Sequence, residues 1–377
     1  MGSAYTPGLT VSARTKITKT RRLPLKGTVL AGEGDWVGPG DTVARAELPG
    51  IMQTVKVAAR LGVEAEEVPS LLVVKVGDTV RRGDVVARTK GLFGLFSSEA
   101  KATTDGVVEL VSNITGNVGI REAPTPVEVH AYVPGRITSV LPGEGVEVTA
   151  HGALIQGIFG VGGERRAPIR IASPDIDHTL TEDDIVESMA GSGIVGGANI
   201  TGGALRKAAE SGIKGIVVGG IVDKDLVDYL GYDIGVAITG HEDIPLTLVL
   251  TEGFGTIAMA RRTFDLLRSL EGREASICGA TQIRAGVIRP EVIVADESPE
   301  ASGAGGAETE PDFTLAVGTP IRIIREPWFG VLATVSGLPP QLVKVESGAE
   351  VRVLEAKLAT TGEVVTVPRA NVEIVAS

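Results

Sequence analysis

The sequence predicts a multidomain α+β protein in which two β-rich regions flank a central α/β domain. Three observations support this. The twelve-residue phrase GDWVGPGDTVAR begins at Gly34 and returns as GDTVRRGDVVAR at Gly77, with eight identical positions. Apolar strands alternate with helical segments over residues 171–294, as in sheets covered by helices. Short alternating strands separated by turns return after residue 312.

The repeated phrase indicates a β domain over residues 1–170. Each copy reads as turn, short strand, turn and short strand, because Gly-Asp favours tight turns and alternating Val gives one apolar face. One such unit cannot bury its apolar face alone, so we expect the two copies to pack on each other. The result is interpreted as a small barrel-sandwich assembly.

The remaining chain is divided at changes of composition. Residues 171–294 predict a mainly parallel sheet, with a helix over 181–190 capped by Thr181 and the longest helix over 256–272. Residues 295–312 are rich in Gly, Ser, Glu and Pro and are interpreted as a flexible acidic linker. Residues 313–377 contain about five short strands, which is typical of an SH3-like barrel.

Composition narrows the possible functions. Aromatic residues are only 3% of 377 residues, so the interior must consist mostly of Val, Ile, Leu and Ala. The net charge of −11 disfavours a broad nucleic-acid surface. Cys278 is the single cysteine, which excludes an internal disulfide. No long apolar run predicts a membrane span, and the N-terminus has no secretory signal pattern, so we expect a cytoplasmic protein.

The segment AKATTDGVVELV, which follows GDVVAR, resembles half of a biotinyl/lipoyl-type hammerhead domain. The N-terminal region as a whole resembles the barrel-sandwich hybrid found in the C component of Rnf-type electron-transport complexes. The full chain is similar to a family of uncharacterised bacterial proteins that join this hybrid to a KOW-like tail. The resemblance implies a fold more than an activity.

The chain departs from both resemblances at the residues that carry cofactors. Carrier domains display the modified lysine within Met-Lys-Met or Asp-Lys-Ala, and neither Lys90 nor Lys101 has such flanks. The Rnf component contains Cys-rich iron–sulfur motifs, whereas this chain has only Cys278. We therefore expect no cofactor. The four histidines are spread along the chain, so we also expect no metal site.

The tail segment VGTPIRIIREPWFGVLATV resembles a KOW module, with Gly330 at the first turn. This resemblance implies contact with RNA or RNA polymerase, which the acidic charge of the chain makes less favourable. Trp328 and Phe329 could stack on a base, insert into a protein pocket or cap the core of the small barrel.

Two strands of the α/β region end alike, in SGIVGGANITGGAL and KGIVVGGIVDKDL. Ligands bind beyond the carboxyl ends of strands in such sheets, where glycines let backbone N–H groups approach an anion. The alternative is that these glycines serve tight packing of strand and helix. The candidate anion-binding residues are Gly196, Gly197, Thr201, Gly219 and Gly220.

The neighbouring segments ITGHED and LTEGFGTIAM bring further polar residues to the same end of the sheet. A histidine beside carboxylates can transfer protons, although it can also lie unused at a surface turn. Two arginines of ATQIRAGVIRPE suit a phosphate or carboxylate. The additional candidates are Thr239, His241, Glu252, Gly253, Gly255, Arg284 and Arg289.

The segment GLFGLF, residues 91–96, places Phe93 and Phe96 where polar turn residues would be usual. It is interpreted either as a loop that folds inward and plugs the sandwich or as an exposed docking patch.

Three functions remain open. The first is a non-catalytic scaffold or adaptor that contacts protein partners, because no nucleophile lies beside a base in the sequence. The second is an enzyme or sensor that binds a small anionic ligand, such as a phosphorylated metabolite or nucleotide, in the α/β domain. The third is an RNA- or transcription-associated protein that acts through the tail.

Overall fold

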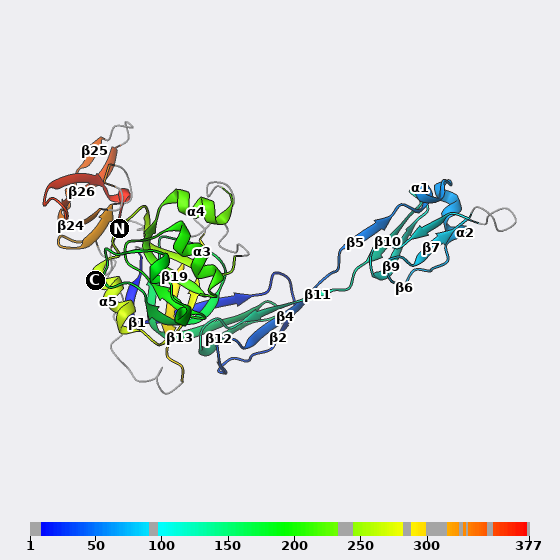
Figure 1. The fold of residues 1–377 in the computed structure, drawn as a ribbon, viewed down its shortest axis with the longest axis horizontal. Helices are drawn as coiled ribbons and strands as arrows, with labels where there is room; N and C mark the ends of the chain where they lie inside the picture. Colours follow the sequence, from blue (N-terminus) through cyan, green and yellow to red (C-terminus); the bar gives the residue numbers. More distant parts are fainter. Residues whose placement is uncertain are drawn as a thin grey trace.

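The structure is a computed structural model that describes residues 9–89, 97–232, 244–281, 288–298, 315–323, 327–328, 331–344 and 350–374. The fold is mainly β, with several sheets and a few short helices. Figure 1 shows an elongated molecule, in which a small module stands away from the rest at the end of a narrow arm. None of the described helices is long and apolar enough to cross a membrane.

An eleven-stranded sheet forms the centre of the molecule. Its strands are β1 (Val11–Arg22), β3 (Trp36–Val37), β12 (Gly135–Leu141), β13 (Gly145–Gln156), β14 (Phe159–Val161), β15 (Arg165–Ile171), β17 (Gly193–Val195), β19 (Gly215–Ile221), β20 (Thr247–Phe254), β21 (Glu274–Cys278) and β22 (Glu291–Ala295). Only β15, β17, β19 and β20 pair in parallel. The expectation of a mainly parallel sheet therefore fits these inner strands alone, because β21 and β22 return antiparallel beside β15.

Helices cover both faces of the parallel strands. Alternate residues of a strand point to opposite faces, and in β19 the side chains of Ile216 and Val218 share a core with α3 (Gly202–Glu210) and α4 (Asp223–Leu230). The side chain of Val217 instead joins the core beneath α5 (Arg261–Ser269). A two-stranded sheet of β16 (Thr179–Leu180) and β18 (Asn199–Ile200) lies beside this layer.

Two predicted helices differ from the structure. Residues 181–190 form two 3-10 turns, η3 (Glu182–Asp184) and η4 (Glu187–Met189), because the chain becomes extended at Ile185, whose side chain is buried in the core. Thr181 still caps the first turn, and its N–H donates to Asp184 Oδ2 at 2.8 Å. The long helix begins only at Arg261, since the preceding residues bond along the sheet end through Ile257 N–H and Ala198 O at 3.2 Å.

The N-terminal half contains two β modules. The base module consists of β1, β2 (Thr28–Val29), β3, β4 (Thr42–Leu48), β11 (Thr125–His130), β12 and β13, and it shares strands with the large sheet. The distal module, residues 50–122, is the one that stands apart in Figure 1. Its elements are β5 (Met52–Val55), α1 (Val57–Leu61), η1 (Ala65–Glu67), α2 (Val68–Leu71), β6 (Thr79–Val80), β7 (Val85–Arg88), β8 (Glu99–Lys101), β9 (Gly106–Ser112) and β10 (Asn117–Arg121).

The two modules have the same strand pairings. In the base module β1 pairs with β13, β13 with β12, β12 with β3, and β4 with β11. In the distal module β5 pairs with β10, β10 with β9, β9 with β6, and β7 with β8. Even the pairing of β2 with β4 has its counterpart in the bridge between Leu72 and Ala87.

The correspondence extends to single hydrogen bonds. The N–H of Gly34 donates to the carbonyl of Ile137 at 2.8 Å, and the N–H of Gly77 donates to the carbonyl of Val108 at 2.7 Å. The register agrees as well, since Trp36 pairs with Arg136 where Thr79 pairs with Val107. The chain therefore contains the same module twice.

The distal module is inserted into the base module. It leaves the base between β4 and β11, which are neighbouring antiparallel strands with Leu48 opposite Thr125. The expectation that the two repeat phrases pack on each other is wrong, because each phrase pairs with the strands that follow it in its own module. Residues 1–170 are thus two nested modules, and β13 and β15 belong to the large sheet.

The C-terminal strands form a separate six-stranded sheet. They are β23 (Pro320–Ile323), β24 (Leu332–Gly337), β25 (Leu342–Lys344), β26 (Glu350–Leu358), β27 (Val364–Pro368) and β28 (Val372–Ile374), with η5 (Arg369–Asn371) before the last strand.

The first two residues of the predicted linker over 295–312 belong to the folded part of the chain, because Ala295 is buried in β22 and Asp296 forms an ion pair with Arg14 at 2.9 Å. Residues 299–314 lie outside the described residues.

Candidate functional site

A groove of about 710 Å³ opens on the distal module. We call it the distal groove. Its apolar wall includes Val76 and Val107, whose side chains are 60% and 42% exposed. Apolar depressions of this kind mark binding surfaces. The other lining residues are Gly77, Thr79, Val80, Arg81, Asp105, Gly106, Val108, Glu109, Arg121, Glu122, Ala123 and Pro124.

A charged pair fixes one side of the distal groove. The guanidinium of Arg121 on β10 forms a two-point contact with the carboxylate of Glu109 on β9, including Nη2 to Oε1 at 3.1 Å. This hydrogen-bonded contact lowers the pKa of Glu109 below its usual value. Arg121 also donates from Nη1 to the carbonyl of Gly50 at 2.9 Å, which ties the groove to the point where the arm enters the module.

In the base module, strands of the large sheet lie opposite the face that corresponds to the distal groove. The base residues Trp36, Gly38 and Pro134 stand at the positions of Thr79, Arg81 and Asp105, and they face β21 and β22 of the large sheet. The base and the large sheet share one apolar core, which contains Val37 and Tyr132 together with Ile293. The same face of the distal module is lined only by residues of that module and its arm within the described chain.

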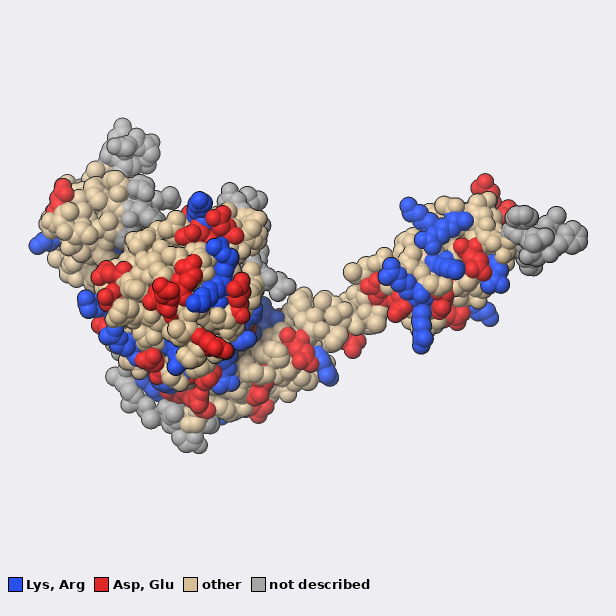
Figure 2. All heavy atoms as spheres, viewed as in Figure 1, with Lys and Arg blue, Asp and Glu red and all other residues tan. Residues whose placement is uncertain are grey.

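The charge of the distal module differs from that of the whole protein. Residues 50–122 contain nine Lys and Arg and nine Asp and Glu, so the net charge of −11 comes from the rest of the chain. Figure 2 shows Lys and Arg side chains gathered on the face of the distal module in view, whereas both signs are mixed over the central part. An acidic partner is therefore not repelled from this module as it would be from the body of the protein.

The four glycines predicted to bind an anion pack against other parts of the protein, three of them against backbone and Gly196 against side chains. A Cβ on Gly219 would lie 2.1 Å from the carbonyl oxygen of Ile257, and one on Gly220 would lie 2.3 Å from that of Gly255. A Cβ on Gly197 would lie 2.6 Å from the carbonyl oxygen of His178, and one on Gly196 would meet Leu180 and Val218. The N–H groups of Gly219 and Gly220 donate to Gly197 O and Ala198 O at 2.8 and 3.0 Å. The space left by the missing side chains of these glycines is thus filled by atoms of the protein itself.

Thr201 acts as the N-cap of α3. Its hydroxyl accepts from Ala204 N–H at 3.1 Å and lies 3.4 Å from Glu182 Oε2. The Glu182 carboxylate occupies the space beside Gly203 in the first turn, where a Cβ would lie 1.5 Å from its oxygen. The N-terminus of α3 is therefore already occupied by the carboxylate of Glu182.

Glu252, Gly253 and Gly255 have structural contacts as well. Glu252 is buried, accepts from Ala260 N–H at 3.0 Å and forms an ion pair with Arg322 of β23 in the C-terminal sheet. Gly253 and Gly255 have positive φ angles of 138° and 106°, which a side chain would strain. Gly255 N–H donates to Ile221 O at 2.7 Å, so this turn closes the strand end.

Of the remaining predicted residues, only Arg289 and Trp328 belong to the described part of the chain. Thr239, His241, Arg284, Phe93, Phe96 and Phe329 lie outside the described residues. Arg289 lies just before β22. Trp328 is half-buried and packs against the apolar core of the C-terminal sheet, as expected if it caps that core.

The residues of the distal groove were not identified from the sequence. A signal was available, because GVVELV at Gly106 and GRITSV at Gly135 continue the repeat 29 residues apart, whereas the first phrases are 43 apart. The base copy comes first in the first pair of phrases and the distal copy comes first in the second pair. This order is expected when the distal copy is inserted within the base copy. Comparison of the sequence with models of protein families and with curated proteins finds no match.

Proposed function

We propose that this protein is a non-catalytic adaptor whose distal module binds a protein partner through the distal groove. The observation that carries the proposal is the duplication. One copy of the module turns this face toward strands β21 and β22 of the large sheet, with a cavity of about 230 Å³ left between them, and the other copy leaves the face open.

The chemistry of the groove favours an extended apolar segment of a protein. In the base module the face receives Ile293 and Ala295 of β22, small apolar side chains that alternate along a strand. The distal groove offers Val76, Val107 and Pro124 for similar contacts, with charged residues at its margin to fix orientation. A partner strand bearing alternate apolar residues meets these requirements.

The resemblance to biotinyl/lipoyl-type domains is consistent with this role. Carrier domains present a small β module to other proteins, and a module of this kind without a prosthetic group would retain presentation alone. The anion-binding alternative loses support because the N–H groups of Gly196, Gly219 and Gly220 and the start of α3 are occupied by the chain itself. The RNA alternative loses support because Trp328 packs on the barrel core.

The test is affinity purification of the full-length protein from its native host, followed by mass spectrometry. A Val107→Asp variant places a charge in the groove at a position that is already exposed, so the fold should remain intact. We expect a protein recovered with the wild type to be lost with Val107→Asp.

Ile114 provides the matched control, because it is 91% exposed on the same module and does not line the groove. Ile114→Asp should retain the partner. Equal recovery by wild type and both variants, with circular dichroism showing folded protein, would reject the distal groove as the binding surface.

A further inference from the structure

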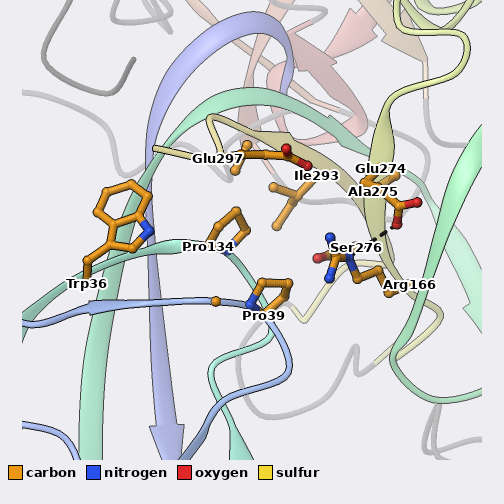
Figure 3. A pocket seen from close by; sticks show the side chains of 11 residues that line it. Trp36, Pro39, Pro134, Arg166, Glu274, Ala275, Ser276, Ile293 and Glu297 are labelled. Carbon is orange, nitrogen blue, oxygen red and sulfur yellow. Dashed lines mark ion pairs between the residues drawn. The ribbon is translucent and has the colours of Figure 1, made fainter. Parts of the chain in front are cut away.

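A second cavity, independent of the distal groove, lies where the base module meets the large sheet. We call it the junction pocket. It has a volume of about 230 Å³ and lies among Trp36, Pro39 and Pro134 of the base and Arg166, Glu274 and Ser276 of the large sheet. In Figure 3, Trp36 stands on one side and Arg166, Ser276 and Glu274 on the other, with Glu297 at the upper margin.

The walls of the junction pocket are fixed by hydrogen bonds. Tyr132 N–H donates to Pro39 O at 2.9 Å, and Ser276 Oγ donates to Tyr132 O at 2.5 Å. Tyr132 is the only non-glycine residue with positive φ in the described chain, at 71°. Such a conformation costs free energy and persists only where surrounding contacts enforce it, commonly near functional sites. The contacts of Tyr132 thus hold both proline loops against β21.

The repeat shows that this cavity varies while its framework does not. The two twelve-residue phrases differ at four positions, and three of them, Trp36, Gly38 and Pro39, line the junction pocket. Their counterparts in the distal copy are Thr79, Arg81 and Arg82. The shared Gly, Asp and Val residues build turns and core in both copies. The positions that differ are therefore those that decide what the cavity contacts.

The polar groups of the junction pocket suit an ammonium compound. Glu274 is paired with Arg166 at 3.2 Å, whereas Glu297 is exposed and has no ion-pair partner among the described residues. The lining thus carries one carboxylate in excess. In Figure 3 the indole nitrogen of Trp36 lies on the side of Pro134, so its N–H can donate to a ligand acceptor.

The size limits the ligand. A volume of about 230 Å³ holds roughly eight water molecules at about 30 Å³ each, which corresponds to a compound of similar heavy-atom count. A neighbouring depression of about 520 Å³ shares Glu274, Ala295 and Glu297, so the pocket is reachable from outside. We propose that the junction pocket binds the ammonium group of a small α-amino acid or of a peptide N-terminus. Glu297 holds the ammonium, Trp36 N–H and Arg166 hold the acceptor end, and Pro39, Pro134 and Ile293 contact the apolar side chain.

Tryptophan fluorescence can test this site directly, because the chain contains only Trp36 and Trp328. In a Trp328→Phe variant of the full chain, Trp36 is the sole indole. We expect a saturable change of its emission on titration with L-valine or L-valinamide, with an affinity on the order of millimolar. N-acetylvaline, which has no ammonium group, should bind about tenfold more weakly or not at all.

Two further variants separate binding from a local structural effect. Glu297→Gln in the Trp328→Phe background should weaken binding about tenfold, whereas Glu66→Gln, an exposed carboxylate on the distal module, should leave binding unchanged. Trp36→Thr copies the distal phrase at an equivalent position and should abolish binding measured by calorimetry.

Valinamide bound more tightly than valine would identify a peptide N-terminus as the source of the ammonium. The reverse order would identify a free amino acid. No saturable signal with either compound up to about 50 mM, or equal affinity in the folded Glu297→Gln variant, would overturn the proposal.

Discussion

Arg322 of the C-terminal sheet and Glu252 of the large sheet form an ion pair in which both side chains are almost fully buried. Arg322 also reaches the carbonyl of Thr251 at 3.4 Å, and Glu252 receives Ala260 N–H. The pair joins residues 70 positions apart and holds the C-terminal sheet against the end of β20. A residue predicted to bind a ligand thus anchors one domain on another.

Removing one partner of this pair should destabilise the protein strongly. Glu252→Gln leaves a buried guanidinium without its counter-charge, and such changes cost about 3–5 kcal/mol. We expect a clear fall in the thermal midpoint for Glu252→Gln and for Arg322→Met, with partial recovery in the double variant.

Arg352→Met serves as the control for these variants, because Arg352 is exposed on β26 of the same C-terminal sheet. It should change stability by less than about 0.5 kcal/mol. Additive losses in the double variant would show that the two side chains do not interact.

Gly219→Ala should destabilise the protein in the absence of any ligand. The added methyl group would lie 2.1 Å from Ile257 O, so backbone must move, at a cost of about 1–3 kcal/mol. Gly40→Ala is the matched control, since a Cβ there has no neighbour within 4 Å. Chemical denaturation measures both. A Gly219→Ala variant as stable as wild type would reopen this strand end as a ligand site.

The stability of the protein should fall at high pH because of Cys278. Burial raises the pKa of the Cys278 thiol from 9.0 to about 11. The unfolded chain then loses its thiol proton before the folded protein does, so stabilisation present below pH 9 is lost as the pH rises towards 11. Relative to Cys278→Ala, the wild type should lose on the order of 2 kcal/mol over this interval.

Denaturation of both proteins at pH 8, 9, 10 and 11 tests this dependence. Burial also raises the pKa of Tyr132, and Cys278 contributes to this rise, so the comparison is made in a Tyr132→Phe background where the two groups cannot be coupled. A constant difference across the range would contradict the proposed cause. At pH 8 the thiol should react with disulfide reagents only after unfolding.

The distal module should fold alone as residues 50–123. Every described residue of its apolar core lies between Val55 and Ile120, so no other part of the described chain completes it. We expect a cooperative thermal transition for the isolated fragment. A fragment with Val118→Ala, which removes part of the fully buried core, should melt at a lower temperature. Absence of a transition in the fragment would show that the arm contributes to stability.

The sequence predicts those elements whose structure depends on residues close together in the chain. The turn-strand phrase, the buried strand of IKGIVVGGI, helix α3 and the C-terminal strands follow from glycine turns, apolar runs and N-caps. The nested arrangement was missed because the phrase is only the first half of each module, and the second halves recur at another spacing. The contact of Glu252 with Arg322 joins two domains and leaves no local pattern. The carboxylate was visible in the sequence, but its partner was not.

The attachment of the distal module has a consequence for evolution. Leu48 and Thr125 stand opposite each other on adjacent strands, about 5 Å apart, so the gap left by excising everything between them needs only a tight hairpin turn. Recombination between Leu48 and Thr125 could replace the distal module with an unrelated domain without disturbing the rest of the polypeptide. The distal module and the rest of the chain are therefore free to diverge at different rates.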